Sequence, residues 1–207
     1  AQAYFDRYRR ARRAAARVTD QLAHAQAAEA TLAQLGADLA LAENRAEIDA
    51  VQEALEGSGL APAARRGAAS RRRAAPSSPT GRPRRYASSD GLTIVVGRNS
   101  RQNETVTFTV AARGDPWLHA RGVPGAHVVV KAAGGPVPTR TIDEAAALAA
   151  WFSAARDAAA VDVAVTDARH VRRLAGGGPG MVTLAHDTTR TVRPASPSAL
   201  GLAEVEG

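Results

Sequence analysis

The chain has 207 residues, a net charge of +7 and a pI of about 11.0. It contains no cysteine, which excludes disulfide bonds and thiolate metal sites and fits a cytoplasmic protein. No apolar run approaches the ~20 residues of a membrane span and no signal peptide is recognised, so we expect no membrane partner. Because Lys131 is the single lysine, the positive charge comes from arginine, which favours an anionic partner such as a phosphate backbone.

Residues 1–57 are predicted to be helical. This segment has no proline and is dominated by Ala, Leu, Arg, Glu and Gln. Its apolar residues recur at spacings of three and four, which predicts a coiled-coil-like seam that needs a partner helix. We expect a single long arm, and the alternative is a helical hairpin that folds back near Gly36. Its first turns carry six arginines against one acid, which indicates either a solvated face or a contact with RNA.

Residues 58–88 are predicted to be a disordered Arg-rich linker. Gly, Ser, Pro, Ala and Arg fill this segment, and it has almost no bulky apolar residue with which to form a core. Such a segment can add sequence-independent affinity for a polyanion.

Residues 89–195 are predicted to form a compact α+β domain, followed by a loose tail at 196–207. The fold class expected for the whole chain is therefore α+β: a long N-terminal coiled-coil helical arm, the linker, and a mixed β-sheet domain with a packed helix. The helix is expected over Thr141–Ala158, with Thr141 and Glu144 as a capping box. Strands are expected at Leu92–Val96, Thr105–Ala111, Trp117–Ala120, Ala126–Ala132 and Val161–Thr166, with a closing hairpin of Met181–Ala185 and Thr189–Val192.

Four polar residues follow the first expected strand directly: Arg98, Asn99, Gln102 and Asn103. Guanidinium and carboxamide groups can grip phosphates, sugars and base edges, so this cluster predicts a nucleic-acid contact. Asn99 and Asn103 can instead satisfy backbone groups of their own turn, and we favour a mixed use in which the asparagines are structural and Arg98 and Gln102 are the more exposed pair.

A second group comprises Asp115, Trp117, His119 and His127. Trp117 could stack on a base, which is worth about 1–3 kcal/mol, or pack in the core. Asp115 and the two histidines could perform acid/base chemistry, hold a metal, or form a structural network. Their spacing matches no established metal motif, so we expect neither a metal nor a cofactor. Together we expect them to line a polar site beside Arg98.

A third cationic group is Arg172 and Arg173, which precede the glycine-rich loop 176–180. Such a loop could approach a phosphate backbone closely, although plain turns are also glycine-rich. The loop lacks the lysine and Ser/Thr of a P-loop, which argues against nucleotide hydrolysis.

The order of these motifs resembles the RNA-binding C-terminal domain of the NFACT family. Tyr4–Arg10 and Ile48–Gly57 are similar to the beginning and the end of the returning arm of that family's coiled coil. Ala126 stands where the family usually has serine. The segments that carry the resemblance in the domain are Val96–Asn99, Gln102–Glu104, Asp115–Ala120, Pro124–Val128, Glu144–Ala146, Val161–Thr166 and Pro179–Val182.

The resemblance implies a role in ribosome-associated quality control. The expected partners are the rRNA of the large ribosomal subunit and tRNA, in support of alanine tailing of stalled nascent chains. A partner arm for the coiled coil would come from the family's N-terminal half, whose tRNA-selecting residues cannot be placed in this chain. Peptide bond formation would belong to the ribosome, so we expect no enzyme. The residues predicted to contact RNA are Arg98, Asn99, Gln102, Asn103, Asp115, Trp117, His119, His127, Arg172 and Arg173.

Two other functions are kept as alternatives. One is a nuclease-like hydrolase that uses Asp115, His119 and His127. The other is a fibronectin-binding surface protein, because family members also carry that name.

Overall fold

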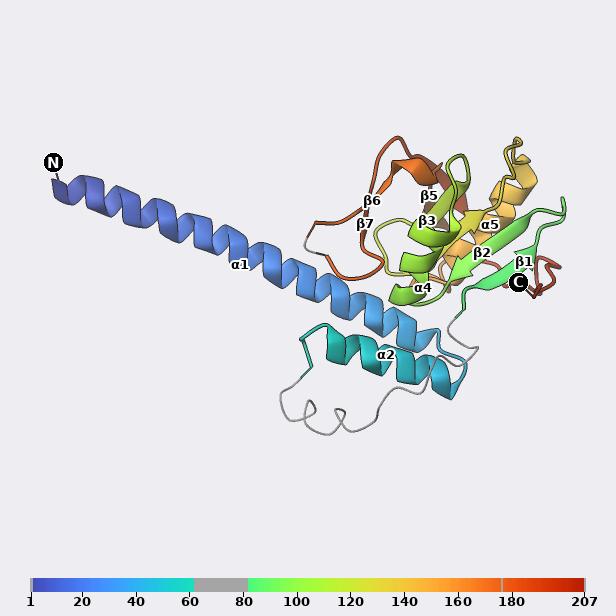
Figure 1. The fold of residues 1–207 in the computed structure, drawn as a ribbon, viewed down its shortest axis with the longest axis horizontal. Coiled ribbons are helices and arrows are strands. Elements are labelled where there is room, and N and C mark those ends of the chain that lie inside the picture. The colour runs from blue at the N-terminus through green and yellow to red at the C-terminus, as the bar shows by residue number, and fades with distance from the viewer. Residues whose placement is uncertain (1, 62–81, 176, 207) are drawn as a thin grey trace.

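The computed structural model describes residues 2–61, 82–175 and 177–206. The chain consists of a helical arm and a globular domain, and α1 (Gln2–Ala40) extends from the domain as a rod with the N-terminus at its far end (Figure 1). The long helical arm and the α+β domain are thereby confirmed. Most of the segment expected to be a disordered linker lies outside the described residues. None of the described helices is both long enough and apolar enough to cross a membrane.

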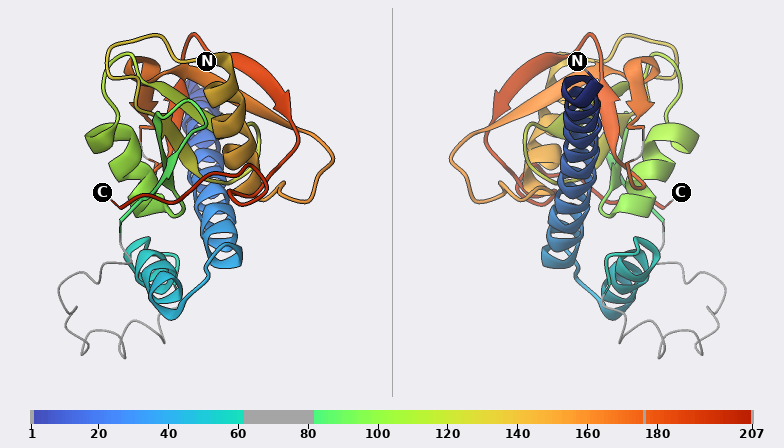
Figure 2. Two further views of the ribbon diagram at one scale, coloured as in Figure 1. Left: turned by 90° about the vertical axis from the view of Figure 1, so that its right-hand side faces the viewer. Right: turned by 90° about the vertical axis from the view of Figure 1, so that its left-hand side faces the viewer.

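The arm is not one continuous helix. It turns at residues 41–44, after which α2 (Arg45–Gly57) packs beside the end of α1 (Figure 2). Asn44 causes this turn because its side chain accepts a hydrogen bond from the Glu47 N–H at 3.0 Å and caps α2. The expectation of a single arm to residue 57 was therefore wrong, and the alternative of a helical hairpin is confirmed, with its turn at residues 41–44 rather than at Gly36.

Helix α1 retains the apolar seam predicted from its sequence. Val18, Leu22 and Leu32 are exposed, so no described segment covers the seam at these positions. The helix therefore fits one strand of a coiled coil.

The globular domain is built on a six-stranded antiparallel sheet with the strand order β1-β2-β4-β3-β5-β8. Strands β6 and β7 form a separate two-stranded sheet. In chain order the elements are β1 (Arg84–Ala87), β2 (Thr93–Gly97), the short helices α4 (Ser100–Thr105) and η2 (Val106–Val110), β3 (Pro116–Ala120), β4 (His127–Val130), α5 (Thr139–Trp151), β5 (Val161–Asp167), the turn η3 (Ala168–His170), β6 (Val171–Arg173), β7 (Val182–Leu184) and β8 (Thr188–Val192).

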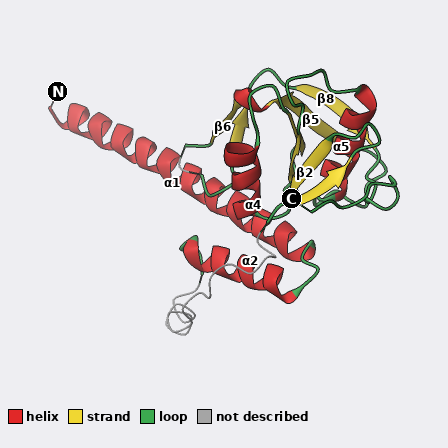
Figure 3. Cartoon of the chain, turned by 45° about the vertical axis from the view of Figure 1, so that its right-hand side comes forward, coloured by secondary structure: helices red, strands yellow, loops and turns green. Residues whose placement is uncertain are grey.

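Both faces of the large sheet are covered (Figure 3). Helix α5 packs on one face, where Ile94, Leu118 and Leu148 belong to the larger core. Helices α4 and η2 and the small sheet cover the other face, over a second core that contains Val95 and Trp117. Because successive residues of a strand point to opposite faces, Ile94 and Val95 serve different cores.

The segment Thr105–Ala111 is helical, so the strand predicted there was wrong. Residues 106–110 form one turn of π-helix, closed by a hydrogen bond from the Ala111 N–H to the Val106 carbonyl. Alternating Val, Thr and Phe indicated a strand, but Val106 and Val110 also lie four residues apart. On a helix this spacing places both on one face, where they pack against the second core.

Helix α5 begins at Thr139, and the predicted capping box does not form. Thr141 instead donates a hydrogen bond to Asp90 at 2.7 Å. Glu144 accepts hydrogen bonds from the backbone and the side chain of Ser89. Both side chains therefore fasten the turn between β1 and β2 to the start of α5.

Two expectations for the end of the chain were also wrong. The predicted closing hairpin is absent, because β7 pairs with β6 whereas β8 pairs with β5 at the edge of the large sheet. The tail is not loose: the Val205 N–H donates to the Arg85 carbonyl, and Leu202 is buried in the larger core. The tail thus lies along β1, a strand that forms inside the segment expected to be linker.

Candidate nucleic-acid interface

The polar cluster after β2 forms the start of α4. The Asn99 side chain accepts a hydrogen bond from the Gln102 N–H at 2.9 Å and caps this helix. The Gln102 side chain in turn accepts from the Arg98 N–H at 3.0 Å. Gln102 is buried, so the structure uses it to hold its own loop.

Arg98 points into the protein and meets the helical arm. Its guanidinium forms an ion pair with Glu47 of α2, and both side chains are buried. A second carboxylate, that of Glu43, lies 3.6 Å from the same guanidinium. The sequence predicted that Arg98 would face RNA. Its partners Glu43 and Glu47 lie 55 and 51 residues earlier in the chain, so no local sequence motif could have predicted these contacts.

Asn103 links the same loop to β4. Its side chain donates to the Gly125 carbonyl at 3.0 Å and accepts from the His127 N–H at 2.9 Å. Asn103 packs so closely against Gly97 that a side chain at Gly97 has no space: an added Cβ would lie 2.8 Å from the Asn103 backbone nitrogen. Asn103 is 1% exposed and therefore serves the fold.

A buried carboxylate also joins the arm to this loop. Asp38 of α1 accepts hydrogen bonds from the Ser100 N–H at 3.0 Å and the Ser100 hydroxyl at 3.1 Å. Gln34, one turn earlier, donates to Asp38 at 2.7 Å and contacts Gly125. Burial raises the pKa of Asp38 to about 6, against the opposing effect of these hydrogen bonds.

Trp117 and His127 belong to one buried network. The Trp117 indole N–H donates to the Thr107 hydroxyl at 3.0 Å, and that hydroxyl lies 2.7 Å from Nδ1 of His127. The Thr107 hydroxyl therefore links the Trp117 indole to the His127 ring. Trp117 is fully buried, so of the two expected roles it takes the one in the core.

His119 lies next to this network and is half-buried. Its ring centroid is 5.2 Å from that of His127 and 5.9 Å from that of Trp117. Burial lowers the pKa of His119 to about 4 and holds the pKa of His127 well below its ordinary value. Both imidazoles are therefore neutral at pH 7, so they offer uncharged donors and acceptors.

Asp115 does not join the histidines. Its carboxylate pairs with Lys131 and accepts from the Ala112 and Ala132 N–H groups. Burial opposes its ionisation, but Lys131 and these hydrogen bonds outweigh that effect and lower the pKa of Asp115. Asp115 precedes β3 whereas His119 lies four residues along the chain, about 13 Å in an extended strand. Among described residues, no group of three or more His, Cys, Asp or Glu could hold a metal.

Arg172 and Arg173 are exposed on β6, at the surface of the small sheet. Arg173 lies 3.9 Å over the Phe108 ring and pairs with Glu104 at 2.6 Å. Arg172 donates to the Arg169 carbonyl at 2.7 Å and has no carboxylate partner among the described residues. These arginines remain available to a partner, unlike Arg98.

The adjacent glycine loop is held against α4. Gly180 has a φ of +77°, and an added Cβ would lie 2.9 Å from the Ser100 carbonyl. Its N–H donates to Glu104 at 3.1 Å. The glycine loop is therefore packed closely against α4 at Gly180, and Glu104 near the end of α4 binds both Gly180 and Arg173.

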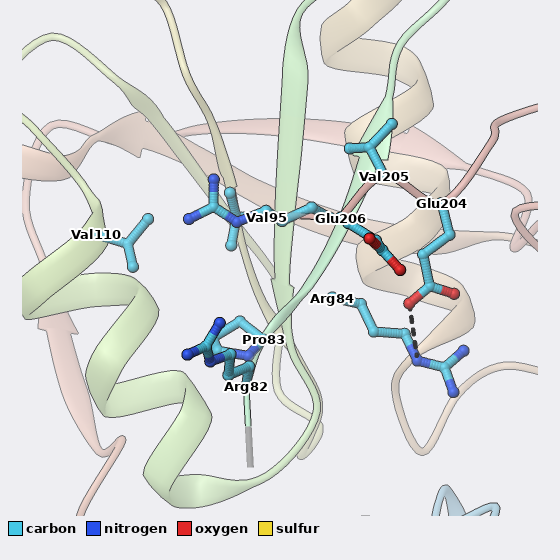
Figure 4. A pocket seen from close by; sticks show the side chains of 9 residues that line it. Arg82, Pro83, Arg84, Val95, Val110, Glu204, Val205 and Glu206 are labelled. Atoms are coloured by element: carbon cyan, nitrogen blue, oxygen red, sulfur yellow. Dashed lines mark ion pairs between the residues drawn. The ribbon is translucent and has the colours of Figure 1, made fainter. Parts of the chain in front are cut away.

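The sequence analysis did not predict a cavity of about 620 Å³ beside β1. It lies between β1, the end of η2 and the tail, and its lining includes Arg85, Val95, Val110 and Glu206 (Figure 4). The arginines of this segment were attributed to a linker. Tyr86, the single large apolar residue among them, was the available signal for a strand.

Two family models match this chain. That of the NFACT protein RNA binding domain matches residues 82–183, and that of the NFACT N-terminal and middle domains matches residues 1–74. The chain belongs to the NFACT family. The first match covers the strands β1 to β7, and the second covers the helical arm.

Curated NFACT relatives agree with this assignment. The chain is 40% identical to the Rqc2 homolog RqcH of Bacillus subtilis over 192 residues, which are 93% of this chain and 32% of that protein. It is 36% identical to the human ribosome quality control complex subunit NEMF over 74 residues, or 35% of this chain and 7% of that protein. The chain thus spans about a third of the length of the RqcH relatives that it matches.

A solved structure has the same architecture. The C-terminal part of the fibronectin/fibrinogen-binding protein from Streptococcus suis matches with a TM-score of 0.84 and 31% identity. The match covers 97% of this chain and 78% of that one.

Proposed function

We propose that this chain is the RNA-binding portion of a ribosome quality-control factor. The observation that carries the proposal is the match of the NFACT RNA-binding domain to residues 82–183, which contain most of the sheet domain described above. Relatives named for ribosome quality control support the same role. The partners proposed are the rRNA of the large ribosomal subunit and tRNA, in support of alanine tailing, with peptide bond formation left to the ribosome.

Within the domain, the predicted RNA-contact residues divide by exposure. We assign direct contacts to Arg172 and Arg173, whose guanidinium groups are exposed and suit phosphate oxygens. His119 and Asn99 are half-buried and stand at the border of the surface. The buried members hold the loop and the sheet in place for these contacts; they are Arg98, Gln102, Asn103, Asp115, Trp117 and His127.

The test is a filter-binding titration of the full chain with tRNA and with large-subunit rRNA at two salt concentrations. We expect saturable binding that weakens as salt rises, because phosphate contacts release counterions. Replacing Arg172 and Arg173 together by alanine should lower the affinity for both RNAs and reduce the salt slope by about two. Absence of saturable RNA binding by the unmodified chain would contradict the proposed function.

Fibronectin binding is a second candidate, favoured by the similarity to the fibronectin/fibrinogen-binding protein of Streptococcus suis. The same chain immobilised on a sensor surface should then bind fibronectin saturably, with the two-arginine variant as a comparison. Binding of fibronectin that matches RNA binding in strength, and that survives high salt, would favour this candidate over the first.

A further inference from the structure

The cavity beside β1 contains a cation without a partner. Arg85 is half-buried and lines the cavity, yet its guanidinium has neither a carboxylate nor a hydrogen-bond acceptor among the described residues. The neighbouring Arg84 differs, because it pairs with Glu43 at 2.5 Å and lies 3.7 Å from Glu204. Arg85 therefore offers the cavity a guanidinium that pairs with no described carboxylate and that can bind an anion.

The strand register explains why Arg85 faces the cavity. Arg85 pairs with Val95 across β1 and β2, whereas Tyr86 pairs with Ile94. Tyr86 and Ile94 belong to the core under α5, so Arg85 and Val95 point to the opposite face. Val110, at the end of η2, lines the same cavity on this face of the sheet.

We propose that this cavity, which Arg82 and Arg84 also line, is a phosphate site for RNA in which Arg85 makes the phosphate contact. The inference rests on the proposed function, and it adds a contact on β1, an edge strand of the large sheet, whereas Arg172 and Arg173 lie on the separate two-stranded sheet. A volume of about 620 Å³ admits a phosphate with its attached sugar. The planar guanidinium offers two parallel N–H groups to the oxygens of a phosphodiester.

The acidic end of the tail limits access to this site. Glu204 and Glu206 both line the cavity, and their carboxylates can be seen at its wall in Figure 4. The tail is held there by backbone pairing, since the Ala87 N–H donates to the Ala203 carbonyl and the Val205 N–H to the Arg85 carbonyl. The carboxylates of Glu204 and Glu206 at the cavity wall repel an incoming phosphate, so neutralising them should strengthen RNA binding.

The experiment is an RNA titration of the full chain at several salt concentrations. Arg85→Ala and Arg85→Gln should each lower the affinity about tenfold and reduce the slope of log affinity against log salt by about one. The glutamine variant retains the length and polarity of the side chain, so it separates loss of charge from loss of packing. The matched control is Arg193→Ala, which removes an exposed arginine with no ion pair among the described residues, next to β8 at the opposite edge.

The double variant Glu204→Gln/Glu206→Gln should raise the affinity several-fold at low salt, and this gain should disappear when Arg85→Gln is added. If both Arg85 variants bind RNA like the Arg193→Ala control while the unmodified chain binds well, the phosphate site is wrong and the proposed function stands. If the unmodified chain binds no RNA, both fall. If the glutamate double variant raised the RNA affinity equally with and without Arg85, the proposal that the tail limits access to the Arg85 site would be wrong.

Discussion

The Arg98 guanidinium and the Glu47 carboxylate form a buried ion pair between the sheet domain and the helical arm, with side chains 6% and 10% exposed. The pair fixes α2 against the loop after β2, while Asp38 of α1 is hydrogen-bonded to Ser100 in the same loop. The segment that looked most suited to gripping RNA therefore anchors the arm. An effect of Arg98 on RNA binding would then follow from the position of the arm.

Removing either member of this pair should destabilise the protein strongly. We expect Arg98→Ala and Glu47→Ala each to lower the free energy of unfolding by about 3–5 kcal/mol, because the remaining charge is left buried. Urea unfolding measures this. A direct RNA contact by Arg98 makes a different prediction: Arg98→Ala would weaken RNA binding, whereas Glu47→Ala would not.

The matched control is the exposed pair of Arg101 and Glu53, which are 2.9 Å apart. Arg101→Ala should cost less than about 1 kcal/mol, because solvent screens exposed pairs. Equal costs for Arg98→Ala and Arg101→Ala would contradict the assignment of Arg98 as a buried anchor.

The sequence predicted the elements whose signal is local. The seam of α1, the β-branched runs of β2 and β4 and the alternation in β5 all identified their segments correctly. The pattern Asn44-x-x-Glu47 is a capping signal that could also have placed the start of α2. It was overlooked because the apolar seam resumes beyond it.

Burial of polar residues could not be predicted in the same way. Arg98 and Asn103 carry groups that suit RNA and groups that suit a structural network equally well. Their partners, Glu47 and the Gly125 carbonyl, are set by tertiary contacts across 51 and 22 residues of chain. Chemistry at one position indicates what a side chain can bind, whereas only the fold decides which partner it meets.

Two glycines in this chain should respond to alanine in opposite directions. At Gly97 an added Cβ would lie 2.8 Å from backbone atoms of Gln102 and Asn103, so Gly97→Ala should destabilise the protein by about 1–3 kcal/mol through overpacking. Gly36 is inside α1 with no atom within 4 Å of an added Cβ, so Gly36→Ala should stabilise it by about 1 kcal/mol. Thermal unfolding distinguishes the two, and a stabilising Gly97→Ala would contradict the close approach.

Thr107 should be sensitive to loss of its hydroxyl alone. Thr107→Val keeps the shape of the side chain but leaves the Trp117 N–H and Nδ1 of His127 without their partner. We expect a loss of about 1–3 kcal/mol in the free energy of unfolding. Thr105→Val is the control, since Thr105 is exposed and its hydroxyl donates only to the carbonyl of Arg101. Similar small effects of both substitutions would show that the network contributes little.

Asp38 should make the protein less stable as the pH rises from about 4 to about 6. Its pKa is raised in the folded protein to about 6 from an ordinary value of 3.8, so in this range the folded state binds a proton that the unfolded state has released. The contribution of Asp38 to stability is therefore complete at low pH, and about 3 kcal/mol of it is lost by pH 7. Asp38→Asn should remove this loss, which urea unfolding at pH 4, 5, 6 and 7 would measure.

The buried histidines should act in the opposite direction over an overlapping range. The pKa of His119 is lowered to about 4 and that of His127 further, so below pH 6.5 the unfolded state binds protons that the folded state does not. Stability then rises as the pH increases from about 4 to 6.5, which offsets the effect of Asp38. Asp38→Asn should therefore steepen the rise, whereas His119→Gln should flatten it. If His119→Gln steepened the rise instead, the folded protein would hold this imidazole charged, and its neutral role beside His127 would be wrong.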